Sequence, residues 1–172
     1  MARAKDGSEE AWTAIYEANF RPIHRYVSAR FFDEDAAADV ASSVFVAAIS
    51  GIRSYSYRGR PVLAWLYRIA HNLVGDYRRK TLREKQQTDS RAVEDLHSRN
   101  GFSPDGDPAG MIGDLDLRAA LQTLPDTQRD VLILRFFVGL STPEIAHVMG
   151  KQPTAVYSLQ ARAVASLRNV LE

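Results

Sequence analysis

The stretch WLYRIAHNLVGDYRRK, residues 65–80, combines an apolar stripe with a concentration of basic and polar side chains. At helical spacing, one face would hold the apolar residues Leu66, Ile69, Ala70, Leu73 and Tyr77, which predicts an amphipathic helix packed on a core. The opposite face would hold Arg68, His71, Asn72, Gly75 and Arg79, with Trp65 at its edge. Charges of one sign on one element repel each other unless an opposite charge meets them, so this face predicts an acidic partner.

Positive charge is concentrated around this helix rather than spread over the chain. Residues 52–80 hold seven basic residues and a single acidic one, Asp76, whereas the whole chain has a net charge of only +1. Aromatic residues (Tyr55, Tyr57, Trp65) alternate with the basic ones, a pattern that suits single-stranded nucleic acid. The simpler alternatives are that Trp65 anchors the core and that the basic run 78–80 only favours a helix C-terminus.

A second motif occupies residues 139–171, GLSTPEIAHVMGKQPTAVYSLQARAVASLRNVL. Ser141 and Glu144 match a capping box, Gly150 suits a left-handed helix end, and Pro153 can open the next helix. This spacing predicts a helix-turn-helix, whose second helix would present Thr154, Tyr157, Ser158, Ala161 and Arg162 outward. An ordinary helical hairpin in a bundle is the structural alternative.

The rest of the chain also shows helical spacing, which predicts the all-α class. We expect one helix over residues 11–20, a second opened by Pro22, and a third over 33–50. Helical spacing returns after Asp114, stops at Pro125, and resumes in a helix that holds Val131 to Val138 and ends at Gly139. Residues 81–113 are polar and rich in Gly, Pro, Asp and Ser, so we expect two small helical domains, 1–80 and 114–172, joined by a linker over 81–113 whose first part could extend the preceding helix.

Composition narrows the function classes. The chain has 172 residues, 45% of them hydrophobic, and no cysteine, which excludes disulfides and cysteine-based metal sites. The start lacks the apolar core of a signal peptide, and apolar runs such as VFVAAI are too short to span a bilayer. We therefore expect a soluble, cytoplasmic protein without membrane insertion.

Taken together, these motifs resemble the extracytoplasmic-function (ECF) group of bacterial sigma factors in the sigma-70 family. The resemblance rests on FRPIHRYVSARFFDEDAAADVASSVFVAAI (20–49), WLYRIAHNLVGDYRR (65–79), and LRAALQTLPDTQRDVLILRFFVGLSTPEIAHVMG (117–150) with AVYSLQARAVASLR (155–168). It implies a dissociable subunit of RNA polymerase, with no enzymatic activity, cofactor or metal, that selects promoter DNA and opens it. The implied partners are core RNA polymerase, through its beta-prime clamp and beta flap, promoter DNA, and an anti-sigma factor.

The resemblance also implies roles for individual residues. The loop with Tyr55, Tyr57, Arg58 and Arg60 would trap a flipped base of the minus-ten element, over which Trp65, Arg68, His71, Asn72, Asp76, Arg78 and Arg79 would lie. The minus-thirty-five element would be read by Lys151, Thr154, Tyr157, Ser158 and Arg162. The polymerase clamp would meet Asp39, Val40, Ser42, Ser43 and Phe45.

Three alternatives remain at this point. A helix-turn-helix repressor or activator would bind duplex DNA without polymerase. A sigma-like protein that has lost polymerase binding is motivated by Ala38, Ser42 and Ser43, where the family often carries glutamate or glutamine. A helical enzyme has little support, because the sequence shows no Gly-rich phosphate loop, metal-type His spacing or cysteine nucleophile.

Overall fold

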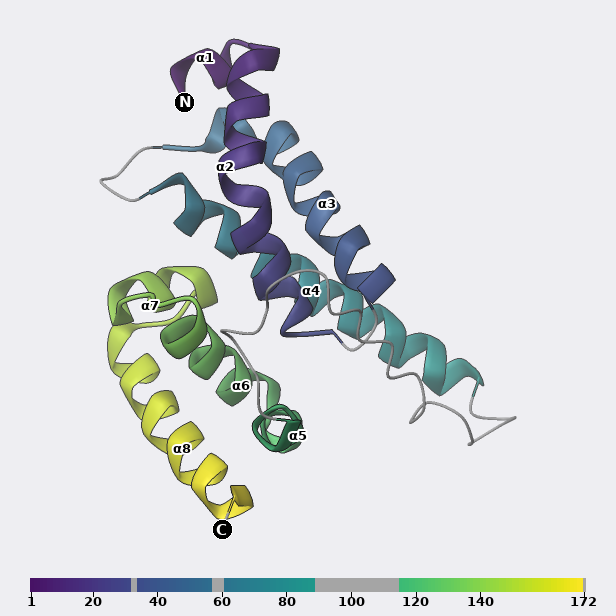
Figure 1. The fold of residues 1–172 in the computed structure, drawn as a ribbon, viewed down its shortest axis with the longest axis vertical. Helices are drawn as coiled ribbons and strands as arrows, with labels where there is room; N and C mark the ends of the chain where they lie inside the picture. The colour runs from purple at the N-terminus through teal and green to yellow at the C-terminus, as the bar shows by residue number, and fades with distance from the viewer. Residues whose placement is uncertain (32–33, 57–60, 89–114, 172) are drawn as a thin grey trace. The chain divides into compact units, whose positions relative to one another are not determined.

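Helices make up both halves of the chain in the computed structural model, which describes residues 1–31, 34–56, 61–88 and 115–171 (Figure 1). The chain divides into two compact units, residues 1–102 and 103–172. The described parts contain helices and no strand, so the predicted all-α class with two helical domains is confirmed. The first unit contains α1 (Ala2–Lys5), α2 (Glu9–Ser28), α3 (Glu34–Gly51), the 3-10 turn η1 (Ile52–Ser54) and α4 (Val62–Thr88).

Helix α2 runs without a break through the proline that was expected to start a new helix. Ser8 caps its N-terminus, accepting a hydrogen bond from the Ala11 N–H at 3.3 Å, and Glu9 and Glu10 complement the helix dipole in the first turn. Pro22 lies inside the helix. Because the next residues, Ile23 and the two after Arg25, are buried against α3 and α4, packing outweighs the backbone hydrogen bond that the proline lacks.

The core of the first unit lies where α2, α3 and α4 meet. The fully buried side chains include Ile23 and Val27 from α2, Val44 and Ala48 from α3, and Leu66, Ala70 and Val74 from α4. Tyr16, Phe20 and Phe45 extend this core as an aromatic cluster, in which the Tyr16 ring lies 4.9 Å from each of the other two rings. The three long helices thus hold one another, and α4 presents its remaining face outward.

Helix α3 is long and predominantly apolar. The segment Glu34–Ser54 is long and apolar enough to cross a membrane by length and composition, with a mean hydropathy of 1.4. Length and average composition alone are weak evidence for a membrane span, because a packed core helix meets the same test. Much of the segment is nevertheless core, because Ala37, Ala41 and Val44 are buried where α3 packs against α2 and α4.

Helix α4 extends into the predicted linker, whose first part was expected to be able to extend the helix. It continues past residue 80, the predicted end of the first domain, to Thr88, so the helix extends into the predicted linker. The remaining linker residues, 89–113, lie outside the described residues.

The second unit contains α5 (Leu115–Thr123), α6 (Asp126–Leu132), the π-helical turn η2 (Ile133–Phe137), α7 (Thr142–Met149) and α8 (Pro153–Leu171). Helix α5 ends before Pro125, as expected. Arg129 joins α5 to α6: its side chain is buried and donates to the carbonyl oxygens of Leu121 at 2.8 Å, Gln122 at 2.7 Å and Leu124 at 3.0 Å. These carbonyls end α5, so one guanidinium satisfies groups that a helix terminus otherwise leaves without intrahelical partners.

The predicted helix over 131–138 is only partly correct. Val131 to Leu134 are buried. In the π-helical turn that follows, the Val138 N–H donates to the carbonyl oxygen of Ile133 at 3.0 Å, and the wider turn changes the directions in which the side chains point. Phe136, which lies within the predicted helix, is 67% exposed.

Candidate nucleic-acid and polymerase interfaces

One exposed row of side chains runs along α4. Arg68, Asn72, Asp76 and Arg79 are all exposed, and their spacing of four, four and three residues places them on one helix face. We call these four residues the α4 row. All four are among the residues predicted to act together on this helix, and the structure places these four on one exposed face.

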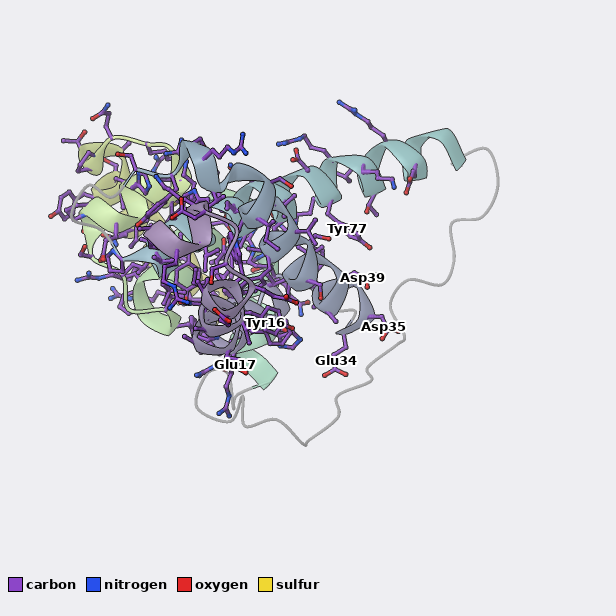
Figure 2. All side chains as sticks on the ribbon, turned by 90° about the horizontal axis from the view of Figure 1, so that it is seen from above. Tyr16, Glu17, Glu34, Asp35, Asp39 and Tyr77 are labelled. Carbon is purple, nitrogen blue, oxygen red and sulfur yellow. The ribbon has the colours of Figure 1, made fainter. Side chains whose placement is uncertain are left out.

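The opposite face of α4 differs from its prediction. The buried residues are Leu66, Tyr67, Ala70 and Val74, whereas Ile69 and Leu73 are only half-buried. Tyr77, expected on the core stripe, is 40% exposed (Figure 2). Its ring packs edge-on against Phe31, with the centroids 4.9 Å apart. The core stripe is thus rotated toward Tyr67 and Val74.

An ion pair lies within the α4 row. Arg79 Nη2 donates to Asp76 Oδ1 one helical turn away, and both side chains are about two-thirds exposed. Exposed pairs of this kind contribute little to stability. The pair instead fixes the orientation of the Arg79 guanidinium, and it lowers the net positive charge of the row.

His71 and Arg78 lie at the border between this row and the core. His71 Nδ1 is 3.4 Å from the hydroxyl oxygen of buried Tyr26, and Arg78 Nη2 donates to the carbonyl oxygen of Arg30 at 3.2 Å. Both side chains are half-buried. The structure therefore does not bring them into the exposed row with which they were predicted to act.

Two of the aromatic residues predicted to contact DNA pack on each other instead. Tyr55 is 6% exposed, and its ring centroid lies 4.9 Å from that of half-buried Trp65. The assignment of Tyr55 as an exposed stacking residue is corrected, because its ring is part of the core between η1 and α4. Tyr57, Arg58 and Arg60 lie outside the described residues.

Helix α3 presents a second exposed surface. Of the residues predicted to meet polymerase, Asp39, Ser42 and Ser43 are exposed, but Val40 and Phe45 are 6% and 5% exposed and belong to the core. Two apolar residues that the sequence analysis missed, Val46 and Ile49, are 64% and 52% exposed. Their spacing from Asp39 and Ser42, in steps of three and four residues, is the signal that could have found them.

Acidic side chains mark the beginning of this helix. The side chains of Glu34, Asp35 and Asp39 extend from its first turns (Figure 2). The positive end of the helix dipole stabilises carboxylates at this end of a helix. The exposed surface of α3 thus changes from acidic at its start to apolar at Val46 and Ile49.

The helix-turn-helix has the predicted local structure. The Ser141 N–H donates to Glu144 Oε2 at 2.8 Å and the Ser141 hydroxyl donates to the same oxygen at 2.6 Å, and both halves of the capping box are present. Gly150 ends α7 in the left-handed conformation, with φ 63° and ψ 35°. Helix α8 begins at Pro153 as expected, and Val156, Leu159 and Ala163 form its buried side.

The outer side of α8 carries the residues predicted to read DNA. Thr154, Tyr157, Ser158 and Arg162 are exposed, as is Lys151 just before the helix, and Tyr157 is 61% exposed. The hydroxyl of Ser158 donates to the backbone carbonyl oxygen of Thr154 at 3.2 Å, and Arg162 Nε donates to the backbone carbonyl oxygen of Ser158 at 3.3 Å. The structure therefore brings these side chains to one surface at the start of the second helix of the motif.

Comparison with known proteins identifies the family of the chain. The family "Sigma-70 region 2" matches residues 15–84, and "Sigma-70, region 4" matches residues 114–167. In an alignment of 178 positions that covers 98% of the chain, the chain is 36% identical to the ECF RNA polymerase sigma factor SigD of Mycobacterium tuberculosis, 81% of which is covered. The chain belongs to the ECF sigma factors of the sigma-70 family.

Further relatives are consistent with this membership. The ECF RNA polymerase sigma factor BldN of Streptomyces coelicolor is 31% identical over 99% of the chain, which spans 64% of BldN. The solved structure of CnrH in complex with the cytosolic domain of CnrY has a TM-score of 0.70 at 25% identity, covering 99% of this chain and 93% of CnrH. RpoE of Bartonella quintana, solved with the anti-sigma factor NepR, has the same fold, with a TM-score of 0.74 at 23% identity over 94% of this chain and 97% of RpoE.

The three surfaces described above all lie within the matched regions. The α4 row and the exposed side of α3 lie within the region 2 match, and the outer side of α8 lies within the region 4 match. A repressor or activator that acts without polymerase is not favoured by these matches. Within the described ranges, no group of three or more His, Asp or Glu side chains is placed to hold a metal ion.

Two buried tyrosines under the α4 row of this sigma factor give a pH prediction. Burial raises the pKa of Tyr67 to about 12, with the nearby Arg25 charge opposing the shift. Burial also raises the pKa of Tyr26, against which the Tyr67 ring packs at 5.4 Å. The unfolded chain ionises these tyrosines near pH 10, whereas the folded chain resists ionisation, so their stabilising effect is complete below pH 10 and is lost as the pH rises toward 12.

We therefore expect the free energy of unfolding to fall above pH 10 by about 1.4 kcal/mol per pH unit for each such group. Urea unfolding between pH 8 and pH 11.5 measures this slope. Tyr67→Phe should flatten it, whereas Tyr157→Phe, which alters an exposed ring, should leave it unchanged. An equal slope in the Tyr67→Phe variant would contradict the prediction.

Proposed function

We propose that this sigma factor binds core RNA polymerase in the cytoplasm, directs it to promoters, and opens the DNA at the minus-ten element. The observation that carries the proposal is the α4 row, exposed side chains on one helix face within the region 2 match. In this assignment residues 1–80 meet polymerase and the minus-ten element, 81–113 connect the domains, and 114–172 read the minus-thirty-five element.

Promoter opening in this mechanism is driven by binding and needs no catalysis by the sigma factor. Arg68 and Arg79 neutralise phosphates, while Asn72 and Asp76 offer an amide and a carboxylate to base edges. Unpairing and unstacking one base costs a few kcal/mol, which contacts to the flipped base offset. Tyr57, Arg58 and Arg60 are assigned to that base.

The outer side of α8 is assigned to the minus-thirty-five element. A helix-turn-helix places the N-terminal part of its second helix in the major groove, which is where Thr154, Tyr157, Ser158 and Arg162 lie along α8. Arg162 has the reach and charge for a guanine edge or a phosphate. Lys151 precedes the helix and suits a phosphate contact.

Replacing Arg162 by alanine tests this assignment. We expect activity on intact promoters to fall about tenfold, which corresponds to loss of one good arginine contact. On promoters with a scrambled upstream element the loss should be small, because the contact is already missing there. Arg168→Ala, which removes another exposed arginine from α8, is the matched control. Equal losses from Arg162→Ala on both promoter types would exclude the assignment.

The exposed side of α3 is assigned to the beta-prime clamp, with Asp39, Ser42 and Ser43 joined by Val46 and Ile49. Exposed apolar side chains beside polar ones form the usual composition of a protein interface. The C-terminal domain is assigned to the beta flap. An anti-sigma factor is a further proposed partner, by analogy with CnrH, which was solved in complex with the cytosolic domain of CnrY.

A carboxylate on this side of α3 should weaken polymerase binding. We expect Val46→Asp to lower the affinity for core polymerase by about tenfold or more, because an unpaired charge would be buried in the interface. Ala18→Asp, which places the same charge at an exposed position of α2, is the control. Titration of labelled sigma factor with core enzyme measures both affinities. An unchanged affinity of the Val46→Asp variant for core polymerase would contradict the assignment. If the wild-type protein does not bind core polymerase at all, the alternative of a sigma-like protein that has lost polymerase binding is favoured.

A further inference from the structure

A glycine interrupts the surface of the α4 row. Gly75 follows Arg68 by seven residues and Asn72 by three, and it precedes Arg79 by four. These are the intervals at which helical residues share a face, so Gly75 lies among the side chains of the row. It is half-buried and lies in the middle of α4. The row therefore has a gap in which the helix backbone, and no side chain, forms the surface.

Nothing in the described part of the first unit requires glycine at this position. Gly75 has the ordinary right-handed helical backbone, unlike Gly150, whose φ is positive. A Cβ added at Gly75 would meet Arg79 Nη1 at 3.6 Å, an ordinary contact with the end of a flexible side chain. Glycine in a helix interior is less favourable than alanine, because it loses more backbone freedom on folding. Gly75 thus lowers the stability of α4 at a position where alanine would fit.

The two cations of the row flank this gap along the helix. Arg68 lies about two turns before Gly75, and Arg79 lies about one turn after it. The Arg79 guanidinium extends back toward the gap, where Nη2 donates to Asp76 Oδ1. The carboxylate beside the gap is thus paired with a cation. Guanidinium donors on both sides of bare backbone suit a group that only accepts hydrogen bonds, and a DNA phosphate is such a group.

We propose that Gly75 is a positioning residue for the minus-ten element, which lets one DNA phosphate approach the α4 backbone between Arg68 and Arg79. This inference rests on the proposed function, because it concerns the same α4 row. It deepens that function by naming the DNA group that lies over the middle of the row. An alanine methyl would raise the surface by about 1.5 Å, the length of a C–C bond, and would move the phosphate away from both guanidiniums together.

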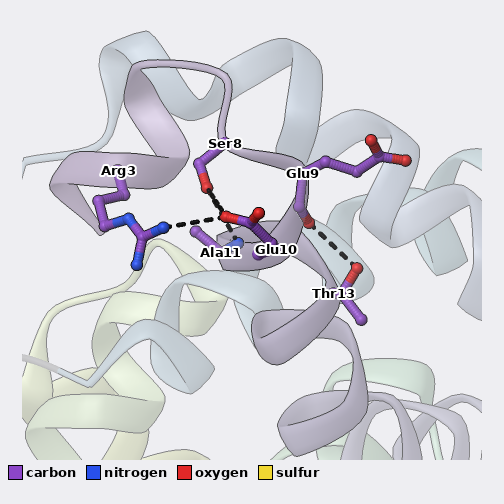
Figure 3. A network of polar contacts seen from close by, with 6 residues as sticks. All are labelled: Arg3, Ser8, Glu9, Glu10, Ala11 and Thr13. Carbon is purple, nitrogen blue, oxygen red and sulfur yellow. Dashed lines mark hydrogen bonds and ion pairs between the residues drawn. The ribbon is translucent and has the colours of Figure 1, made fainter.

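The first measurement is the stability of the protein without polymerase or DNA. We expect Gly75→Ala to raise the urea midpoint, followed by the fluorescence of Trp12 and Trp65, because alanine favours the helix. Thr13→Ala is the matched control on α2. Thr13 is exposed and its hydroxyl donates to the Glu9 carbonyl oxygen at 3.0 Å (Figure 3), so this variant should also raise the midpoint. A lower midpoint for Gly75→Ala would overturn the inference, since the protein itself would then need the glycine.

The second measurement is open-complex formation by the reconstituted holoenzyme. We expect Gly75→Ala to lower it about tenfold although the variant is more stable, with the affinity for core polymerase unchanged. Gly75→Met, which adds a longer side chain that also favours helix, should lower it further. Thr13→Ala should leave it unchanged. Unchanged opening by Gly75→Ala, or an equal loss in Thr13→Ala, would overturn the inference. A loss of polymerase affinity as large as the loss of opening would overturn it too.

The third measurement identifies the DNA group. Each phosphate of the minus-ten element is replaced in turn by a neutral methylphosphonate, and the affinity of the holoenzyme for a forked promoter fragment is measured. At the phosphate over Gly75, the losses from the methylphosphonate and from Gly75→Ala should not add, because both remove the same contact. Additive losses at every position would overturn the inference. If the wild-type holoenzyme opens no promoter, the proposed function fails and the inference with it, whereas failure of the inference alone leaves wild-type opening intact.

Discussion

Open-complex formation is expected to fall about a hundredfold when Arg68 and Arg79 are both replaced by alanine, with the affinity for core polymerase unchanged. Both side chains are exposed on α4, so their removal leaves the core intact. The loss exceeds that of two phosphate contacts, because Asp76 loses the guanidinium that now pairs with it and its charge then faces DNA. The slope of log affinity against log salt should decrease by about 2.

Permanganate reactivity of thymines in the bubble measures the opening, and titration with core enzyme measures the binding. Arg3→Ala with Arg21→Ala is the matched control, because it removes the same charge from exposed positions outside α4. If the control lowers opening as much as the α4 variant, long-range charge rather than the α4 row is responsible. Unchanged permanganate reactivity in the Arg68, Arg79 variant would contradict the assignment of the row.

Replacing Arg129 by methionine is expected to destabilise the second unit by roughly 3–5 kcal/mol, without changing the first. Methionine keeps most of the apolar stem, but the carbonyl oxygens of Gln122 and Leu124 lose the guanidinium donor, and that of Leu121 keeps only the longer bond from the Leu124 N–H at 3.3 Å. Buried acceptors without partners are expensive, so the effect should exceed that of a typical surface hydrogen bond.

Two probes separate the units in urea unfolding. Trp12 and Trp65 both lie in residues 1–102, so tryptophan fluorescence reports the first unit, whereas circular dichroism reports helices in both. We expect part of the circular dichroism transition to move to lower urea while the fluorescence midpoint stays unchanged. Arg135→Ala, which removes an exposed arginine with one hydrogen bond to Leu140, should change stability by no more than about 0.5 kcal/mol. A similarly small effect of Arg129→Met would refute the capping role.

The features that the sequence predicted correctly are those that local chemistry determines. The capping box at Ser141, the left-handed Gly150 and the start of α8 at Pro153 depend on residues within a few positions of one another. The α4 row was also predictable, because charged and amide side chains at helical spacing do not share a face with the core.

The features that the sequence predicted wrongly depend on distant partners. Apolar residues on α4 occupy two adjacent stripes, and only packing against α2 and α3 decides that Tyr67 and Val74 are buried and Tyr77 is exposed. Tyr55 is buried by Lys5 and Trp65, the first of them 50 positions away. No local pattern contains such a contact.

Two further errors have their own physical causes. Pro22 was expected to start a new helix, but the buried residues that follow it pack against α3 and α4 and keep it within α2. Helix α3 carries apolar residues on more than one face, and the sequence does not show which of them are buried. Val40 and Phe45 were therefore predicted to contact polymerase although they are buried, whereas the exposed Val46 and Ile49 were missed. The roles of individual residues toward DNA and polymerase therefore depend on the experiments above.

Reconstituted transcription tests the central claim most directly. Purified protein, core RNA polymerase from the source organism and fragmented genomic DNA are combined, and the 5′ ends of the transcripts are sequenced. We expect defined start sites that share two spaced upstream motifs. The more distant motif should no longer contribute to promoter activity when Arg162 is replaced by alanine. Absence of any such start sites, from core enzyme that is active with another sigma factor, would contradict the claim that this chain directs promoter-specific initiation.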